Sequence, residues 1–465
     1  MTSRFSVRFF DFSAYNVHKR FYKENQMEIY TVRPGDTIFS ISRQYGVPES
    51  RIVNDNLLSD PTRLTVGESL IIRFPSQTYT VRGGDTLSFI SESTGTDIIT
   101  LLQYNPILKG RSNVYPGQVL NTGYPDKKLG ETVTNGYVYP FVSEDDIRST
   151  LPYLTYLSVF SYGFRPDGSL IDPDGGDERL LALSREYGTI PMLTLTSISE
   201  NGSFSTEKVE LLLSSPDFYK KVAGLLAKIA AEKGYGGVDL DFEYIPTDLA
   251  ESYADFAKIV KEALPDGYEL FVSLAPKTSA SQPGLLYEGH RYDLLGKIAD
   301  RVLLMTYEWG YKYGPPLAVS PLPQVERVIQ YGVSEIKPAK ILMGVPNYGY
   351  DWELPYIRGE TVAKTISNTE ALQIATDRRV SISFDETAEA PFFNYYAPRA
   401  SGGIAEHVIW FDDARSIGAK LPLIARYSLG GGGVWNVTRY FPALWTIIST
   451  LFSIRKKEFQ PEPLE

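Results

Sequence analysis

The stretch that decides the fold is GGVDLDFE at residues 236–243. Side chains two apart on a β-strand point to the same side, so Asp239, Asp241 and Glu243 form one row at steps of about 6.6 Å, opposite an apolar row. On an exposed antiparallel strand the acids would simply face water. In a closed parallel barrel the apolar row packs on outer helices and the acids point into the lumen, where barrel enzymes keep catalytic groups. The pattern alone leaves both interpretations open.

Short β-rich runs alternate with helical stretches on both sides of this segment. Repeated βα units predict an α/β protein with a parallel sheet, and their number favours a (β/α)₈ TIM barrel over an open sheet. The long interval between residues 345 and 433 predicts a small α+β insertion, at about residues 355–420, between strands seven and eight. The predicted strands are 156–160, 191–195, 237–242, 270–275, 302–306, 341–345 and 433–437, and the predicted helices include 218–233 and 251–263.

Several chemistries are excluded by residue counts. The 465-residue chain has no Cys, which removes disulfides, Cys-ligated zinc, Fe–S clusters and thiol nucleophiles. Its three histidines, His18, His290 and His407, are too few and too scattered for a multi-His metal site, so we expect no metal and no cofactor. A Ser-His-Asp triad would depend on His290 or His407 and has no nucleophile-elbow motif to support it.

Charge and aromatic content narrow the range of partners. The net charge is −10 without a basic stripe, so we expect no nucleic-acid binding. The apolar stretch 441–454 is too short to cross a bilayer and predicts a last amphipathic helix, so we expect no membrane contact. We also expect a monomer. Aromatic residues make up 13% of the chain. Their faces can stack on sugar rings, although an ordinary core would also explain them.

The N-terminal part contains an internal repeat. YTVRPGDT at residues 30–37 recurs as YTVRGGDT at residues 79–86, and each copy predicts a strand, a capped turn, two helices and a second strand. Residues 1–26 lack the apolar core and cleavage site of a signal peptide, and we expect them to form a disordered leader.

Both copies resemble LysM modules, at residues 27–75 and 77–124. The resemblance implies two small βααβ units that bind N-acetylglucosamine polymers through the turn after the first strand and the stretches following Asn56 and Asn105. The alternative is that Asp36 and Asp85 only cap helices and the modules are spacers. The implied glycan-binding residues are Gly35, Asp36, Thr37, Gly84, Asp85 and Thr86.

Residues 131–455 resemble glycoside hydrolase family 18, the chitinase-like family. The acidic row matches its strand-four motif D-G-x-D-x-D-x-E, with Gly236 in place of the first Asp. The segment 305–308 is similar to the strand-six M-x-Y-D, with Glu308 in place of Asp. Further matches are G-x-P-x-Y-G at 344–349, the segment 411–420 that ends the inserted subdomain, and 432–435 on strand eight.

The resemblance implies a substrate-assisted retaining mechanism. Glu243 would act as general acid and then general base, while the N-acetyl group of the substrate attacks C1. Asp241 would orient the acetamido N–H and share a proton network with Asp239, and Tyr307 would bind the acetamido oxygen. The implied sugar-contacting residues are Trp435, Tyr348, Asn347, Glu308 and Met305.

This mechanism requires N-acetylglucosamine at the cleaved bond, which both peptidoglycan and chitin supply. Paired LysM modules on a cysteine-free family 18 domain resemble spore-cortex-lytic N-acetylglucosaminidases that act in germination. We therefore expect peptidoglycan or cortex fragments as partner and the spore as location, without a classical signal peptide, or otherwise the cell wall. The alternatives are a chitinase acting on chitin oligomers and a non-catalytic glycan-binding lectin.

Overall fold

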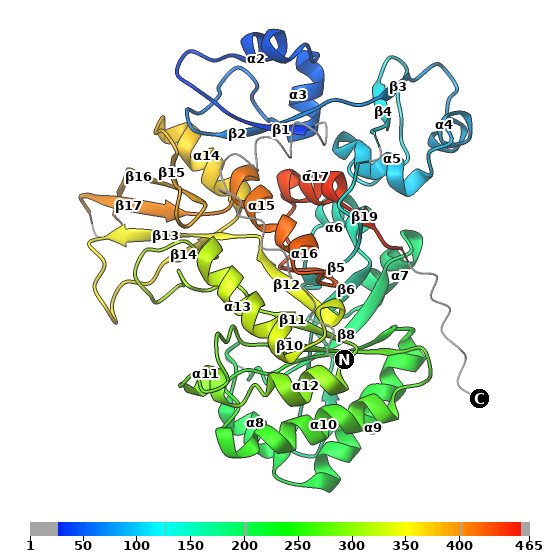
Figure 1. Cartoon of the computed structure of the whole chain (residues 1–465), viewed down its shortest axis with the longest axis vertical. Helices are drawn as coiled ribbons and strands as arrows, with labels where there is room; N and C mark the ends of the chain where they lie inside the picture. Colours follow the sequence, from blue (N-terminus) through cyan, green and yellow to red (C-terminus); the bar gives the residue numbers. More distant parts are fainter. Residues whose placement is uncertain (1–26, 126, 200–201, 400–401, 457–465) are drawn as a thin grey trace, which may run out of the picture.

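The computed structural model describes residues 27–125, 127–199, 202–399 and 402–456. It has three parts: two small N-terminal modules, an α/β barrel, and a sheet-and-helix insertion beside the barrel (Figure 1). The leader predicted over residues 1–26, with His18, lies outside the described residues.

Eight parallel strands close into a barrel, which confirms the predicted fold class. The ring closes because β5 pairs with β6 on one side and with β18 on the other. Two short strands, β7 (Leu170–Ile171) and β19 (Ser453–Ile454), extend the sheet beside β6 and β5. The barrel order is β5 (Glu131–Val138), β6 (Tyr156–Phe164), β8 (Ile190–Thr196), β9 (Gly237–Asp241), β10 (Glu269–Leu274), β11 (Arg301–Leu304), β12 (Ile341–Pro346) and β18 (Gly431–Trp435).

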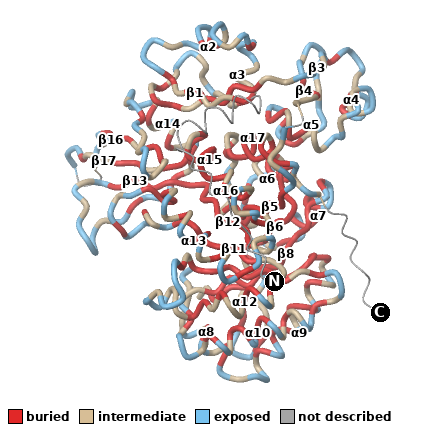
Figure 2. The backbone as a smooth tube through the Cα atoms, in the orientation of Figure 1, coloured by how far each residue is buried: buried red, intermediate tan, exposed pale blue. Residues whose placement is uncertain are grey.

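The outer and inner faces of the strands have separate apolar cores. Val238, Leu240 and Phe242 belong to the outer core, and the Phe242 ring lies 5.6 Å from Tyr253 and 6.2 Å from Phe256 of α10, centroid to centroid. Figure 2 shows the barrel strands buried along nearly all of their length. The acidic row of β9 therefore points into the lumen, and the exposed antiparallel strand is excluded.

Helices surround the barrel, and α8, α9, α10 and α12 cover its lower side in Figure 1. The predicted last helix is α17. No helix in the described part of the chain is both long and apolar enough to cross a membrane. The helices of this domain are α6 (Glu144–Thr150), α7 (Glu178–Glu186), α8 (Thr206–Leu213), α9 (Pro216–Lys233), α10 (Ala250–Ala263), α11 (Leu285–Glu288), α12 (Tyr292–Ile298), α13 (Leu322–Glu335), α15 (Ala414–Lys420), α16 (Pro422–Arg426) and α17 (Pro442–Leu451).

The insertion between strands seven and eight is a five-stranded antiparallel sheet with one helix, α14 (Asn368–Arg378). It starts earlier than the predicted residue 355, because β13 follows β12 after only two residues and its sequence does not mark the change of sheet. The sheet ends at Trp410, before α15. Its strands are β13 (Gly349–Leu354), β14 (Lys364–Ile366), β15 (Ser383–Asp385), β16 (Ala390–Pro398) and β17 (Ile404–Trp410).

Each N-terminal module is a two-stranded antiparallel sheet with two helices between its strands, as predicted. Both modules contribute side chains to the apolar core that continues into the barrel, so they are docked on the domain. The first module consists of β1 (Met27–Thr31), α2 (Ile38–Tyr45), α3 (Glu49–Asn56) and β2 (Ser69–Arg73), and the second of β3 (Gln77–Thr80), α4 (Leu87–Thr94), α5 (Ile98–Tyr104) and β4 (Val119–Gly123).

The Gly-Asp-Thr turns have the same hydrogen bonds in both modules. Thr37 caps α2 by accepting from the Ser40 N–H at 3.0 Å. Asp36 is not the cap, because its carboxylate accepts from the Tyr30 hydroxyl at 2.6 Å and from the Arg33 N–H at 2.7 Å. The interpretation of the aspartates as helix caps is therefore wrong. In the second module the same roles fall to Thr86, Phe89, Asp85, Tyr79 and Arg82.

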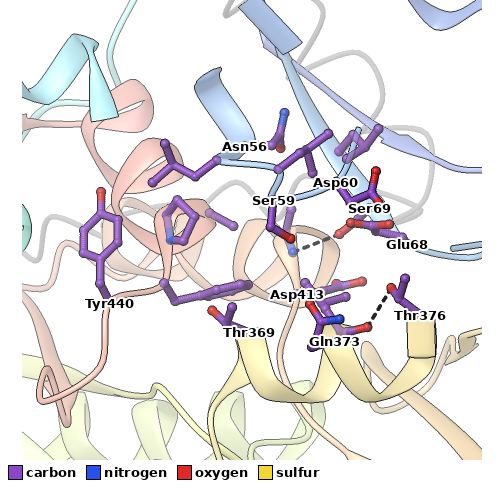
Figure 3. A pocket seen from close by; sticks show the side chains of 18 of the residues that line it. Asn56, Ser59, Asp60, Glu68, Ser69, Thr369, Gln373, Thr376, Asp413 and Tyr440 are labelled. Atoms are coloured by element: carbon purple, nitrogen blue, oxygen red, sulfur yellow. Dashed lines mark hydrogen bonds between the residues drawn. The ribbon is translucent and has the colours of Figure 1, made fainter. Parts of the chain in front are cut away.

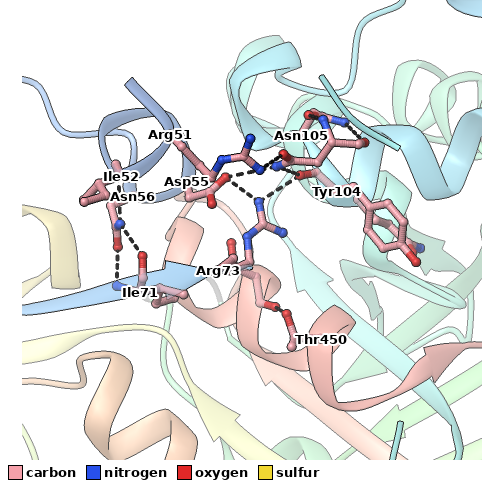
Figure 4. A network of polar contacts seen from close by, with 12 residues as sticks. Arg51, Ile52, Asp55, Asn56, Ile71, Arg73, Tyr104, Asn105 and Thr450 are labelled. Atoms are coloured by element: carbon pink, nitrogen blue, oxygen red, sulfur yellow. Dashed lines mark hydrogen bonds and ion pairs between the residues drawn. The ribbon is translucent and has the colours of Figure 1, made fainter. Parts of the chain in front are cut away.

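A buried ion pair of the first module lies at its junction with the second module, and hydrogen bonds from two arginines join the modules there (Figure 4). The guanidinium of Arg73, at the end of the first module, donates to Asp55 at 2.6 Å and to the Tyr104 carbonyl of the second module at 2.8 Å. Arg51 adds a hydrogen bond to Asn121 at 2.5 Å. Since the side chains of Arg73 and Asp55 are 1% and 3% exposed, each charge depends on the other for compensation.

The first module also contacts the insertion. The Ile382 N–H donates to the Val66 carbonyl at 2.9 Å, and the hydroxyls of Thr65 and Thr376 lie 2.7 Å apart. A Cβ at Gly67 would lie 1.9 Å from the Ile382 carbonyl oxygen, so only glycine allows this approach. A module predicted from a local repeat is thus part of the tertiary structure of the enzyme domain.

The stretches after Asn56 and Asn105, which we expected to contact glycan, lie at these interfaces. Residues 57–60 line a cavity of about 290 Å³ between the first module, α14 and the start of α17 (Figure 3). In the second module the Gly110 carbonyl accepts from the Tyr187 hydroxyl of the barrel domain at 2.7 Å. The turns at 35–37 and 84–86 are away from these interfaces and largely exposed.

We expect Arg73→Met to destabilise the folded chain by about 3–5 kcal/mol, because it leaves Asp55 buried without its counter-charge. Thermal unfolding measures the effect. The matched control is Arg63→Met, which removes a half-exposed ion pair to Asp377 and should cost under about 1 kcal/mol. Equal shifts for the two variants would contradict a stabilising junction.

Candidate active site

The deepest member of the acidic row is Asp239. It is fully buried in the lumen and accepts a hydrogen bond from Ser158 of β6 at 2.7 Å. Burial raises the pKa of Asp239 to about 6, and the hydrogen bonds from Ser158 and Tyr137 act in the opposite direction. Gly236, which replaces the first acid of the motif, precedes β9 at the other end of the strand, so this replacement does not alter the cleft.

Asp241 and Glu243 continue the row toward the carboxyl end of the barrel. Burial, the Glu243 charge and the Asp239 charge raise the pKa of Asp241 well above its ordinary value. Burial and then the charge of Glu308 raise the pKa of Glu243 to about 7. Since like charges cannot all ionise together at this spacing, Glu243 can hold a proton near neutral pH and transfer it to a reacting group.

Met305 and Tyr307 follow β11, which is separated from the acidic strand β9 by β10, and both line the cleft. Each is less than a tenth exposed. Burial, followed by the charges of Asp241 and Glu243, raises the pKa of Tyr307 well above its ordinary value. Its hydroxyl therefore stays protonated and can donate a hydrogen bond to a ligand.

Glu308 occupies the position of a shorter acid in the motif. Its carboxylate accepts hydrogen bonds from the hydroxyls of Tyr348 and Tyr350, the latter at 3.0 Å. Burial raises the pKa of Glu308, while the two tyrosines act to lower it. The longer side chain thus reaches a tyrosine pair at the start of the insertion. Its charge contributes to raising the pKa of Glu243.

These side chains line one cavity of about 950 Å³ at the carboxyl end of the barrel strands. The predicted residues of the enzyme domain meet here, with Asp239 beneath the others. The six predicted glycan-binding residues of the modules do not line it. The predicted residues in the cavity wall are Asp241, Glu243, Met305, Tyr307, Glu308, Asn347, Tyr348 and Trp435.

An aromatic wall forms around Trp435 at the end of β18. The Trp435 ring is half-buried and meets Phe160 edge-to-face, with centroids 4.8 Å apart. Tyr139 also contacts it, and Phe141, which is 75% exposed, stacks on Tyr139 at 5.2 Å. An array of exposed ring faces at a cleft suits the apolar faces of sugar rings.

Asn347 has a positioning role. Its amide donates to the carbonyls of Asn436 at 3.0 Å and Arg439 at 2.8 Å, and its backbone N–H donates to the Trp435 carbonyl at 2.8 Å. We expected a sugar contact at this residue. These bonds hold the segment after Trp435 in place, and because Asn347 also lines the cavity, the sugar contact stays a prediction.

Several cavity residues were not predicted from the sequence, because they lie on loops, on the short helix α11 or in the insertion, where no periodic pattern gives their direction. Tyr244 and Glu308 have positive φ angles of 56° and 69°, conformations that non-glycine residues adopt mainly at constrained sites. No sequence signal marks Tyr244, whereas the resemblance at 305–308 had already identified Glu308. The residues missed in the cavity wall are Tyr139, Phe141, Phe204, Tyr244, Pro276, Gly284, Leu285, Leu286, Tyr287, Tyr311, Tyr350, Thr365, Ile366, Asn436, Thr438 and Arg439.

The described histidines do not form a nucleophilic triad. His290 is buried, with its pKa lowered to about 3 by burial and by Lys277, and His407 pairs with Asp351 at 2.9 Å in the insertion. Within the described ranges, no group of three or more His, Asp or Glu side chains is arranged to hold a metal ion.

The family model of glycosyl hydrolases family 18 matches residues 189–439, more than half of the chain. The chain belongs to glycosyl hydrolases family 18. It is therefore a glycoside hydrolase by family. The LysM domain model matches residues 30–73 and 79–122, which places one LysM domain in each N-terminal module.

Full-length relatives share this architecture. The cortical fragment-lytic enzyme of Bacillus anthracis is 36% identical over 437 residues, covering 93% of this chain and all of the relative. The crystal structure of the Bacillus cereus spore cortex-lytic enzyme SleL matches with a TM-score of 0.78 and 35% identity, over 93% of this chain and all of that chain. That of Bacillus megaterium SleL gives 0.77 and 34%, with the same coverage.

Glu308→Gln should shift the alkaline limb of the pH–activity profile to lower pH. Removal of the Glu308 charge makes ionisation of Glu243 easier and so lowers its pKa from about 7. The pH dependence of kcat/KM on an N-acetylglucosamine oligomer measures the shift. Glu262→Gln, at an exposed site on α10, should leave the profile in place. An unchanged or upward-shifted limb for Glu308→Gln would refute the electrostatic coupling.

Proposed function

We propose that this protein is an N-acetylglucosaminidase of spore-cortex peptidoglycan, which cleaves the β-1,4 bond after N-acetylglucosamine during germination. The observation that carries the proposal is the lumenal row that ends in Glu243, a carboxyl with a pKa raised to about 7 inside an aromatic cleft. The full-length likeness to cortical fragment-lytic enzymes supports the cortex as substrate and the spore as location.

In the proposed mechanism Glu243 protonates the leaving glycosidic oxygen. The acetamido oxygen of the substrate attacks C1 and forms a cyclic intermediate, and Glu243 then removes a proton from the water that opens it. The anomeric configuration is retained because C1 is displaced twice. No second enzyme carboxylate is needed as nucleophile.

Asp241 and Tyr307 would prepare the acetamido group for attack. Asp241 Oδ1 is buried and has no hydrogen-bond partner among the described residues, which leaves it able to accept the acetamido N–H. Tyr307 would donate its hydroxyl to the acetamido oxygen. Asp239 supports Asp241 from below, and the sugar would stack on Trp435.

Glu243→Gln should lower the release of reducing ends from cortex fragments by about 10³-fold, because glutamine cannot donate the proton. Co-sedimentation with peptidoglycan should be unchanged, since the proposed wall-binding turns are elsewhere. Retained hydrolysis by this variant would refute the assigned role. Loss of both hydrolysis and sedimentation would point to misfolding, which circular dichroism would detect.

The LysM modules would anchor the enzyme to insoluble wall through their exposed turns. Each turn is followed by an exposed phenylalanine, Phe39 at 59% and Phe89 at 50%, which can stack on a sugar ring. We assign Phe39 and Phe89 to the same proposed glycan-binding surfaces as the predicted residues at 35–37 and 84–86.

Phe39→Ala combined with Phe89→Ala should weaken sedimentation with insoluble peptidoglycan by about tenfold, because two stacking faces are lost. Hydrolysis of soluble fragments should be unchanged. The matched control is Tyr396→Ala, an aromatic residue of the insertion that is 66% exposed. Unchanged sedimentation, or an equal loss on soluble fragments, would contradict the anchoring role.

A further inference from the structure

One positively charged side chain faces an otherwise acidic cleft. Arg439 is the only basic residue that lines the 950 Å³ cavity among the described residues, and Asp241, Glu243 and Glu308 line the same space. A neutral sugar polymer does not need a cationic side chain in the cleft in order to bind. An anionic substituent on the substrate does, because the acids would otherwise repel it.

The guanidinium of Arg439 has N–H groups that can donate hydrogen bonds to a ligand. Its side chain is 56% exposed, and its ion pair among the described residues is a long one, 3.5 Å to Glu370. Glu370 is shared with Lys364 at 2.7 Å, so it is not reserved for Arg439. Arginine has five N–H donors in a fixed plane, a geometry that fits a carboxylate with two parallel hydrogen bonds.

The backbone holds this side chain near the sugar platform. Arg439 lies four residues after Trp435, so their Cα atoms are at most about 14 Å apart. Asn347 binds the Arg439 carbonyl at 2.8 Å, and the Thr438 hydroxyl accepts from the Tyr139 N–H at 3.3 Å. Since Trp435 and Arg439 line the same cavity, a sugar over Trp435 would bring substituents of its neighbours toward the arginine.

We propose that Arg439 binds a carboxylate of the substrate and selects peptidoglycan over chitin. This inference rests on the proposed function and names the chemical group of the substrate that the cleft recognises. Chitin carries no carboxylate. Peptidoglycan carries carboxylates on its stem peptides, and on the lactyl group of the muramic sugar where the peptide is absent. Both sources present the same chemistry to Arg439.

The test compares three soluble substrates in the full chain: a chitin oligomer, a peptidoglycan strand stripped of peptides, and a strand that retains them. Arg439→Gln should lower kcat/KM by about tenfold or more on a carboxylate-bearing strand and by less than about twofold on the chitin oligomer. Loss confined to the stripped strand identifies the lactyl carboxylate, and loss confined to the other identifies the stem peptide. Arg439→Lys should restore part of the activity, since it keeps the charge without the planar fork.

Binding gives a readout that does not require hydrolysis. In the Glu243→Gln background, glycan binding at the cleft can be followed by tryptophan fluorescence, because all five tryptophans lie outside the modules. Arg439→Gln should raise the Kd of a carboxylate-bearing strand about tenfold and leave that of the chitin oligomer unchanged. This measurement decides the inference even if the proposed hydrolysis fails.

The matched control is Arg327→Gln, which removes an exposed arginine of α13 that does not line the cavity. It should change none of these values. Equal losses on all three substrates, or no loss on either carboxylate-bearing strand, would overturn the assignment of Arg439.

Discussion

The central physical constraint on this structure is the electrostatic repulsion between the carboxylates that the barrel brings together. Asp239 and Asp241 are on β9 and buried in the lumen, and Glu243 follows two residues after the strand at the cleft. Ionising all of them together would be costly at this spacing, which favours the protonated form of some of them. The outermost acid, Glu243, retains a proton near neutrality because burial and then the charge of Glu308 raise its pKa to about 7.

The rest of the molecule holds this unfavourable cluster in place. Ser158 donates a hydrogen bond to the carboxylate of Asp239, and two tyrosines donate hydrogen bonds to the carboxylate of Glu308. The insertion supplies Tyr350 to that pair, and the first LysM module packs on the insertion through Thr65 and the tight approach at Gly67. The modules are thus joined to the same framework that positions the cleft.

Much of this architecture could be predicted from local patterns. The alternation at 236–243 placed the three acids on one face, and the resemblance to family 18 favoured the inward direction. The repeated Gly-Asp-Thr turns gave both modules with their correct element order. Strand β5 was absent from the predicted set because ETVTNGYV mixes polar and apolar residues without a clear period. The start of the insertion was placed too late because nothing local separates β13 from β12. The aromatic wall was missed because Phe141 and Tyr244 lie on loops whose direction no periodicity predicts.

By itself the sequence determined which side chains share a face, because alternation along a strand is set by the backbone of that strand alone. The tertiary structure decided that this face is the inside of a barrel, because closure depends on β5 pairing with both β6 and β18, nearly 300 residues apart. It also decided that Glu308 meets Tyr348, that Arg439 turns toward the cleft wall, and that the modules dock on the enzyme domain. Each of these contacts joins residues distant in the chain, and local patterns carry no information on such distances.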